Sequence, residues 1–336
     1  MQKIILVVLL FTTFRLTAQK ISAADLRALK SIESEMSTPA KDMVFAEEAS
    51  TRFEADSLFT RKFVEALKIN NSFYFPFDSI ITVSQLMAPD SSFRIFTWEL
   101  KRDESYFRQK GAIQMRTEDG SLKLFPLLDM SDYSENPVDS VRSNVNWIGA
   151  IYYNMIMNEY KGKKYFTLFG FDDNNFLSTR KWLEVLTFDT NNKPVFGGRF
   201  FDYKDDSLKS PQPAYRFLLE FKKDAGTRLN YDPETKLILF DHLVSESNES
   251  QKKFTLVPDG DFEAFKWAEG RWLHIDTAFH DKIQLGKEPR PKPLFDESGN
   301  PNEDELLEQS EKNKEKETVP KKKTPPNALD EIKEII

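Results

Sequence analysis

The stretch IGAIYYNMIMNEYKGKKYFTLFGF, residues 148–171, decides the fold class. Two runs rich in aromatic and β-branched residues, Ile148–Tyr160 and Lys164–Phe171, flank Lys161-Gly162-Lys163. Such runs on either side of a short turn with glycine are typical of a β-hairpin. Around the first run, Val145–Asn158 is so densely apolar that a helix and a strand fit equally well.

Similar short runs rich in aromatic and β-branched residues continue on both sides of this hairpin. Another hairpin is indicated where Glu118-Asp119-Gly120 joins two alternating runs, because Asp-Gly is a strong turn signal. Phe176–Phe188 fits either a helix or a strand. About a dozen short runs with few helices between them favour antiparallel meanders over parallel βαβ units. We therefore predict a mainly β fold, an irregular antiparallel sandwich or open barrel, with a degenerate propeller as the alternative.

The chain before the β-rich part has helical periodicity. Ser22-Ala23-Ala24-Asp25 resembles a capping box that begins one helix. Pro39 suits the first turn of a second helix. On a helical wheel, one side of this second helix would be apolar, although Arg52 and Asp56 interrupt it. The apolar set is Phe45, Ala49, Phe53, Phe59, Phe63 and Leu67. We expect these helices to cover a face or an edge of the sheet.

The first residues have the pattern of a secretory signal peptide. Lys3 precedes the apolar run Ile4–Phe14, and small residues follow it. Eleven residues are too few for a membrane span, which needs about 20. We therefore expect residues 1–19 to be removed and the mature chain to lack a transmembrane segment. The chain has no cysteine, so it can have neither disulfides nor the cysteine of a lipoprotein anchor. A periplasmic or extracellular location follows.

Composition divides the rest of the chain into a folded body and a tail. The residues after position 285 hold seven of the 17 prolines and many charges of both signs. Such a composition cannot bury enough apolar surface to fold. We predict four parts: a signal peptide (1–19), a helical segment (20–71), an antiparallel β domain (72–285) and a disordered tail (286–336). Without Lys3 and Arg15 the balance is 45 cations against 54 anions, a net charge of −9, which argues against nucleic-acid binding.

Residues for catalysis are scarce. The absence of cysteine excludes a thiol enzyme, and no Gly-x-Ser-x-Gly elbow occurs. His242, His274 and His280 are the only imidazoles, and we interpret the first two as structural residues. Paired carboxylates for sugar hydrolysis are always available in an acidic chain, so they carry little weight on their own.

The residues most suited to binding lie in two groups. The first is the acidic turn Asp172-Asp173-Asn174-Asn175, whose oxygens suit calcium but are also ordinary turn residues. A second acidic turn, Asp259-Gly260-Asp261 followed by Glu263, is a weaker calcium alternative. The other group is aromatic: Trp147 and Tyr153 would line a groove for a glycan, or fill the space between sheets. No cofactor is expected, with calcium as the alternative.

Three segments resemble uncharacterised secreted proteins of the Bacteroidota. They are Phe93–Trp98, Tyr160–Asp172 and Pro258–Trp267, and the Thr17-Ala18-Gln19 end of the leader is similar as well. The resemblance covers most of residues 70–280 and implies an address in the periplasm or outer envelope. It brings no activity or site residues.

The sequence therefore favours a non-enzymatic binding or accessory protein of the cell envelope. The tail would contact an envelope partner. A secreted carbohydrate-active hydrolase using paired carboxylates is the first alternative, and a calcium-dependent binding module is the second.

Overall fold

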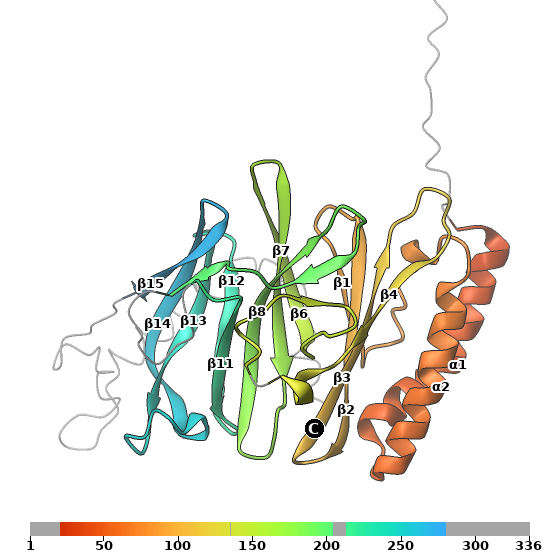
Figure 1. Cartoon of the computed structure of the whole chain (residues 1–336). Helices are drawn as coiled ribbons and strands as arrows, with labels where there is room; N and C mark the ends of the chain where they lie inside the picture. Colours follow the sequence, from red (N-terminus) through yellow and green to blue (C-terminus); the bar gives the residue numbers. More distant parts are fainter. Residues whose placement is uncertain (1–20, 135, 204–212, 280–336) are drawn as a thin grey trace, which may run out of the picture. The chain divides into compact units, whose positions relative to one another are not determined.

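The computed structural model describes residues 21–134, 136–203 and 213–279. These residues form two α-helices, three β-sheets and three short 3₁₀ helices, Ser72–Tyr74, Ser131–Tyr133 and Lys253–Thr255, in one compact unit. The mainly β, antiparallel class is confirmed, and the sheets stack as in a sandwich (Figure 1). The predicted signal peptide and the tail from residue 286 lie outside the described residues. No helix in the described ranges is long and apolar enough to cross a membrane.

The first layer is a pair of helices, α1 (Ala23–Phe45) and α2 (Ala49–Leu67). Ser22 caps α1 as predicted, because its Oγ accepts a hydrogen bond from the Asp25 amide at 3.1 Å. The prediction for Pro39 is wrong: it lies inside α1 and is buried. Met36 and Met43, on either side of it, lie in the same apolar cluster, and this packing offsets the backbone hydrogen bond that proline cannot make.

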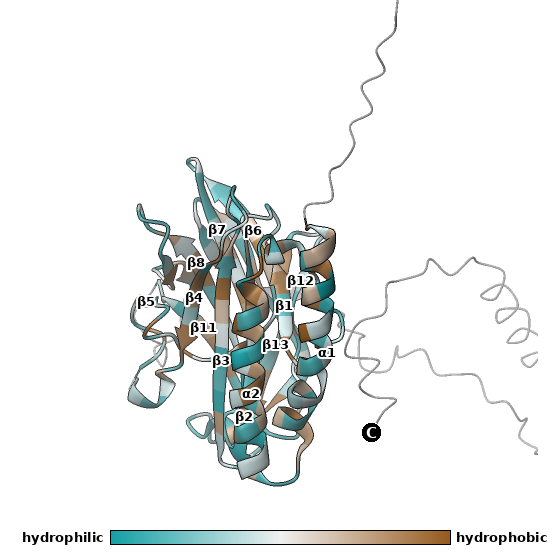
Figure 2. Ribbon diagram, turned by 90° about the vertical axis from the view of Figure 1, so that its right-hand side faces the viewer, coloured by the Kyte–Doolittle hydropathy of each residue, from teal (hydrophilic) through white to brown (hydrophobic). Residues whose placement is uncertain are grey.

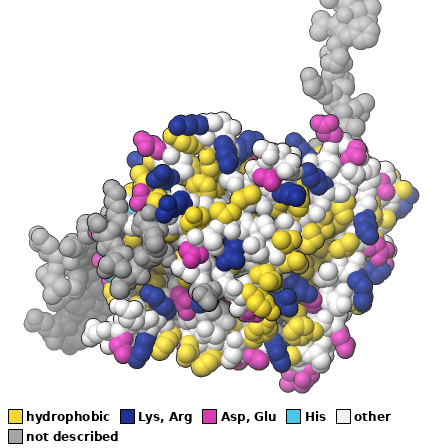
Figure 3. Space-filling view, in the orientation of Figure 1, with side chains coloured by type: hydrophobic (Ala, Val, Ile, Leu, Met, Phe, Trp, Pro, Cys, Tyr) yellow, Lys and Arg dark blue, Asp and Glu magenta, His cyan; other side chains and the backbone are white. Residues whose placement is uncertain are grey.

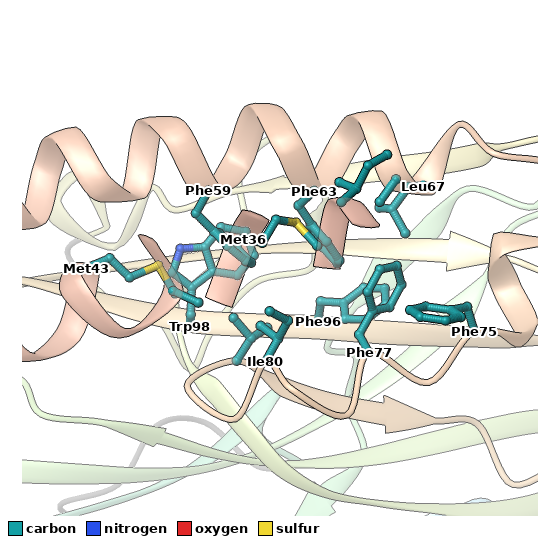
Figure 4. Packing of buried hydrophobic residues seen from close by; sticks show 14 of the residues in the cluster. Met36, Met43, Phe59, Phe63, Leu67, Phe75, Phe77, Ile80, Phe96 and Trp98 are labelled. Atoms are coloured by element: carbon teal, nitrogen blue, oxygen red, sulfur yellow. The ribbon is translucent and has the colours of Figure 1, made fainter. Parts of the chain in front are cut away.

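The second layer is the helix-side sheet, in the order β1-β2-β3-β4. Its strands are β1 (Ser84–Met87), β2 (Phe93–Asp103), β3 (Tyr106–Met115) and β4 (Lys123–Leu128). Figure 2 shows the two helices lying across this sheet. Phe96 and Trp98 of β2 pack against Phe59 and Phe63 of α2, as Figure 4 shows. Phe45 and Phe53, expected on the apolar side, are 72% and 39% exposed. Phe45 belongs to α1, before the break at residues 46–48, and Phe53 lies six residues before Phe59, about 240° around α2, so neither ring joins the buried face of α2.

The third layer is the central sheet. Its strands are β5 (Arg142–Ser143), β6 (Ile151–Tyr160), β7 (Lys163–Asp172), β8 (Ser178–Phe188), β9 (Pro194–Phe196) and β11 (Arg216–Lys222). The order is β5-β9-β8-β7-β6, and β11 pairs with β8 beside β9. The hairpin at residues 161–163 is confirmed as β6 and β7. Both stretches that fitted a helix or a strand, Val145–Asn158 and Phe176–Phe188, contribute strands.

The fourth layer is the outer sheet, in the order β10-β15-β14-β13-β12. Its strands are β10 (Phe201–Asp202), β12 (Leu229–Asp232), β13 (Leu237–Ser245), β14 (Leu256–Ala268) and β15 (Arg271–Phe279). All pairings are antiparallel except the short one between β10 and β15.

Separate apolar clusters hold the layers together. Phe93, Ile95 and Ile113 of the helix-side sheet pack with residues of β7 and β8, including Phe166 and Leu186. On the other face of the central sheet, a third cluster includes Phe169, Val185 and Phe217 with Phe240, Phe265 and Trp272 of the outer sheet. Because the two inner sheets are covered on both faces, successive residues of β2 and β8 are buried instead of alternate ones.

Candidate functional site

A pocket of about 260 Å³ lies between β11 of the central sheet and β13 and β14 of the outer sheet. Its apolar wall includes Phe217, Leu219 and Phe240, and the segment between β13 and β14 closes one side. The polar part of the lining includes Glu220, Asp241, His242, Lys253 and Glu263. The volume is just below the range of about 300–1,000 Å³ that is usual for small-molecule sites.

A break in strand pairing gives the pocket its polar side. Asp241 of β13 pairs with Phe262 of β14, but Leu243 pairs with Pro258, so the register shifts at His242. Three residues of β14, 259–261, are left without partners on β13, and Gly260 has the left-handed φ of +96°. Bulges of this kind re-aim side chains and are common beside functional sites.

Two histidines, His242 of β13 and His274 of β15, lie at one buried carboxylate, that of Glu263. His274 Nε2 lies 2.6 Å from Glu263 Oε2, and His242 Nε2 lies 4.0 Å from Glu263 Oε1. The Tyr203 hydroxyl donates to Glu263 Oε2, and the Tyr203 ring stacks on His274 with centroids 3.7 Å apart. The side chains of Glu263 and His274 are 7% and 5% exposed. The hydrogen-bond partners of the buried Glu263 carboxylate thus come from β15 and from the residue that follows β10.

His242 is held from its other side. Its Nδ1 lies 2.8 Å from Asp259 Oδ2, and its side chain is 43% exposed at the pocket. A carboxylate on Nδ1 fixes the orientation of the imidazole and leaves Nε2 directed toward Glu263 and the pocket. The arrangement can bind a hydrogen-bonding group of a ligand. It also resembles the acid–base half of a hydrolytic site, although none of the described contacts joins His242 to a serine or threonine hydroxyl.

The acidic turn predicted to bind lies elsewhere, between β7 and β8. Asp172 Oδ1 accepts hydrogen bonds from Gln109 Nε2 at 2.9 Å and from the Asn174 amide at 2.8 Å. Asn175 Oδ1 accepts from the amides of residues 177 and 178. Asp173 pairs with Lys223 at 2.6 Å. These oxygens are thus engaged by donors of the protein, which is ordinary turn chemistry. Among the described residues, no group of three or more His, Asp or Glu side chains is arranged to hold a metal ion.

One carboxyl from the helix-side sheet joins this turn. Glu99 Oε2 accepts from Gln109 Nε2 at 2.6 Å and from the Asp173 amide at 3.3 Å. Burial, together with the charges of Asp173 and Asp172, raises the pKa of Glu99 to about 8. Burial also raises the pKa of Asp172 to about 6. Glu99 and the turn therefore form a cluster of carboxyl groups whose pKa values lie on either side of neutral pH.

The two aromatic residues proposed for a groove lie in different layers. Trp147 is fully buried between the helix-side and central sheets, and its Nε1 donates to the Tyr152 hydroxyl at 2.7 Å. Tyr153 packs against the cluster between the central and outer sheets, and its hydroxyl donates to the Leu229 carbonyl. Burial raises the pKa of Tyr153. The structure thus places both in packing positions, apart from each other.

The sequence reading missed the pocket because its polar residues come from distant positions. The sequence predicted a structural role for His242, and it gave Asp259 and Glu263 only as part of a weaker calcium alternative. Their convergence depends on a two-residue change of register between β13 and β14, which the spacing of residues in the sequence does not reveal. We found no family model, curated protein or solved structure that matches this chain.

Proposed function

We propose that this chain is a non-enzymatic binding protein of the cell envelope that takes a small ligand in the pocket between β11, β13 and β14. The observation that supports the proposal is the combination of an apolar wall with converging polar groups around Glu263 and His242. Concave sites of this composition are the usual places for small ligands. The proposed location rests on the predicted signal peptide and on the resemblance to secreted proteins.

The lining indicates what kind of group enters. Aromatic and leucine side chains offer contact to an apolar or ring-shaped part of a ligand. His242, Lys253 and Asp241 offer donors and an acceptor to a polar part. At about 260 Å³ the pocket holds a single group, such as one sugar unit, an amino-acid side chain or the end of a larger molecule.

The first experiment is a ligand screen by thermal unfolding, with variants that report on the pocket. A ligand present at 100 times its Kd stabilises the folded state by about 2.7 kcal/mol. For a body of this size that is about 5–10 °C in Tm. Leu243→Trp, at a half-buried lining position, should fill the pocket and abolish the shift. Val145→Trp, on a surface 58% exposed and outside the lining, is the matched control.

A hit whose stabilisation persists in Leu243→Trp binds elsewhere and contradicts the proposal. So does a screen of sugars, amino acids, peptides and fatty acids in which no compound shifts Tm.

Hydrolysis is the second candidate function, and the Asp259–His242 pair at the pocket supports it. Such a pair can remove a proton from water, a role that imidazole performs well near neutral pH. Turnover of ester or glycoside substrates that is lost in His242→Gln, with Tm unchanged, would establish an enzyme. The calcium-dependent module predicts a fall in Tm on adding a chelator, and an unchanged Tm would exclude it.

A further inference from the structure

One buried amide group joins carboxyl groups from two different sheets. Gln109 Nε2 donates both to Glu99 Oε2 of β2, at 2.6 Å, and to Asp172 Oδ1 of β7, at 2.9 Å. Gln109 and Asp172 are 2% and 8% exposed. Two carboxyl groups therefore share the two protons of one amide in a place that water reaches poorly. When both are ionised, their repulsion is opposed by this neutral donor, by nearby backbone amides and by the charge of Arg180, which lowers the pKa of Asp172.

The charged groups around this pair are mostly engaged with each other. Asp129, which follows β4, accepts from the backbone amides of Gln109 and Gly149. Arg180 of β8 pairs with Glu220 at 2.9 Å. Lys223, at the end of β11, pairs with Asp173 at 2.6 Å. The ion pairs of these two cations are thus with Glu220 and Asp173, although the charge of Arg180 also acts on Asp172.

A short chain of hydrogen bonds leads from the carboxyl pair to the pocket. The Asn174 amide donates to Asp172 Oδ1 at 2.8 Å, and Asn174 Nδ2 donates to Ser178 Oγ at 2.7 Å. Ser178 Oγ donates to Glu220 Oε1 at 2.6 Å. Glu220, on β11, lines the pocket. The turn between β7 and β8 therefore contacts the carboxyl pair at one end and the pocket wall at the other.

We propose that protonation of the Glu99–Gln109–Asp172 cluster regulates the pocket. This inference rests on the proposed binding function. With a proton on the cluster, the two carboxyl groups stay together and hold the β7–β8 turn closed on Glu220. Loss of that proton separates them, loosens the turn and changes the position of Glu220 in the pocket wall. The raised pKa values of Glu99 and Asp172 bring this change into the range between about pH 6 and pH 8.

The test is an NMR titration of backbone amides from pH 5 to pH 9, which needs no ligand. In the wild-type chain, Asn174, Ser178 and Glu220 should titrate together with a midpoint between about pH 6 and pH 8. Glu99→Gln keeps the shape and removes the charge, so the upper part of the shared transition, near pH 8, should disappear while the part due to Asp172, near pH 6, remains. Asp232→Asn is the control and should leave the shared transition intact, because this carboxyl, at the end of β12, accepts, within the described residues, only from the turn that leads to β13.

His242 is another ionisable side chain that lines the same pocket as Glu220. The comparison between the wild-type chain and Glu99→Gln separates its effect from that of the cluster, because His242 is unchanged in both. A Glu220 amide that titrates identically in both chains, or a turn that titrates without Glu220, overturns the proposal. If Glu99→Gln does not fold, Asp172→Asn replaces it, and the part of the shared transition near pH 6 should then disappear.

Failure of the binding function is a different result. If the shared transition is observed but the chain binds no ligand, the coupling between the carboxyl cluster and Glu220 stands, and only the proposed binding function is contradicted. Once a ligand is known, its affinity should differ at least threefold between pH 5.5 and pH 8.5 in the wild-type chain. In Glu99→Gln that difference should shrink, and an unchanged difference would contradict the regulation.

Discussion

The buried Arg216 allows a sharp test of what fixes the central sheet. Its side chain is 1% exposed, and Nε donates to Glu184 Oε2 at 2.7 Å. Nη1 donates to the carbonyls of Pro137 and Ser140 at 2.9 and 2.7 Å, and Nη2 donates to that of Phe196 at 3.2 Å. One guanidinium therefore ties β11 to β8, β9 and the segment before β5.

Replacement of Arg216 by Met keeps the volume and removes every one of these donors. Glu184, 2% exposed, would keep the hydrogen bond from the Tyr152 hydroxyl but lose its cation. Breaking a buried pair in this way costs about 3–5 kcal/mol. Three carbonyls that lose their donor add to that cost. Against a total stability of about 5–15 kcal/mol, we expect Arg216→Met to be close to unfolded at 37 °C.

The assay is denaturant unfolding followed by tryptophan fluorescence, arranged as a double-mutant cycle. Glu184→Gln in the Arg216→Met background removes the stranded charge and should restore about 2 kcal/mol or more, which is the part due to the uncompensated carboxylate. Arg216→Met within about 1 kcal/mol of the wild-type chain would refute this reasoning. So would a double variant no more stable than the single one.

Three further predictions follow from the layers and the tail. Phe63→Ala should cost about 3–5 kcal/mol in denaturant unfolding, because its buried ring contacts three other aromatic rings in the helix-side cluster. The free energy of unfolding should decrease as the pH rises from about 4 to 8. The raised pKa values of Glu99 and Asp172 make the folded state bind more protons than the unfolded one over this range. That slope should be smaller in Glu99→Gln, and an equal slope in both chains would contradict the assignment. Deletion of residues 286–336 should leave Tm unchanged within about 1–2 °C and abolish cross-linking to an envelope partner, and a complex of equal strength without the tail would exclude the docking role.

Local features of the chain were predictable because they depend on neighbouring residues. The turn at Gly162 has a left-handed φ of +72°, which the residue itself predicts. The cap at Ser22 depends on a residue three positions away. The antiparallel class also follows from strand texture and turn spacing.

The phase of the helices was not predictable in the same way. Arg52 and Asp56 interrupt the apolar side of α2 on a wheel, yet both are buried. Arg52 donates to the carbonyls of Lys101 and Arg102 of β2, and Asp56 accepts from Trp98 Nε1. Polar residues that appear as flaws in an amphipathic pattern are thus the contacts between the helices and the sheet. Their partners lie about 40–50 residues away and have no signal in the local pattern.

The binding residues were hidden for a related reason. Apolar faces can slide over one another at small cost, whereas a buried hydrogen bond is satisfied in only one register. Between each pair of layers such a bond is present: Asp56 with Trp98, Thr97 with the Tyr152 amide, and Thr167 with Trp272. These contacts fix how the sheets face one another, and that alignment places Glu220 of β11 opposite His242 and Glu263 in the pocket. The site is therefore a product of the stacking itself, and a variant that alters one of these interlayer bonds should change ligand binding even though the altered residue lies outside the pocket.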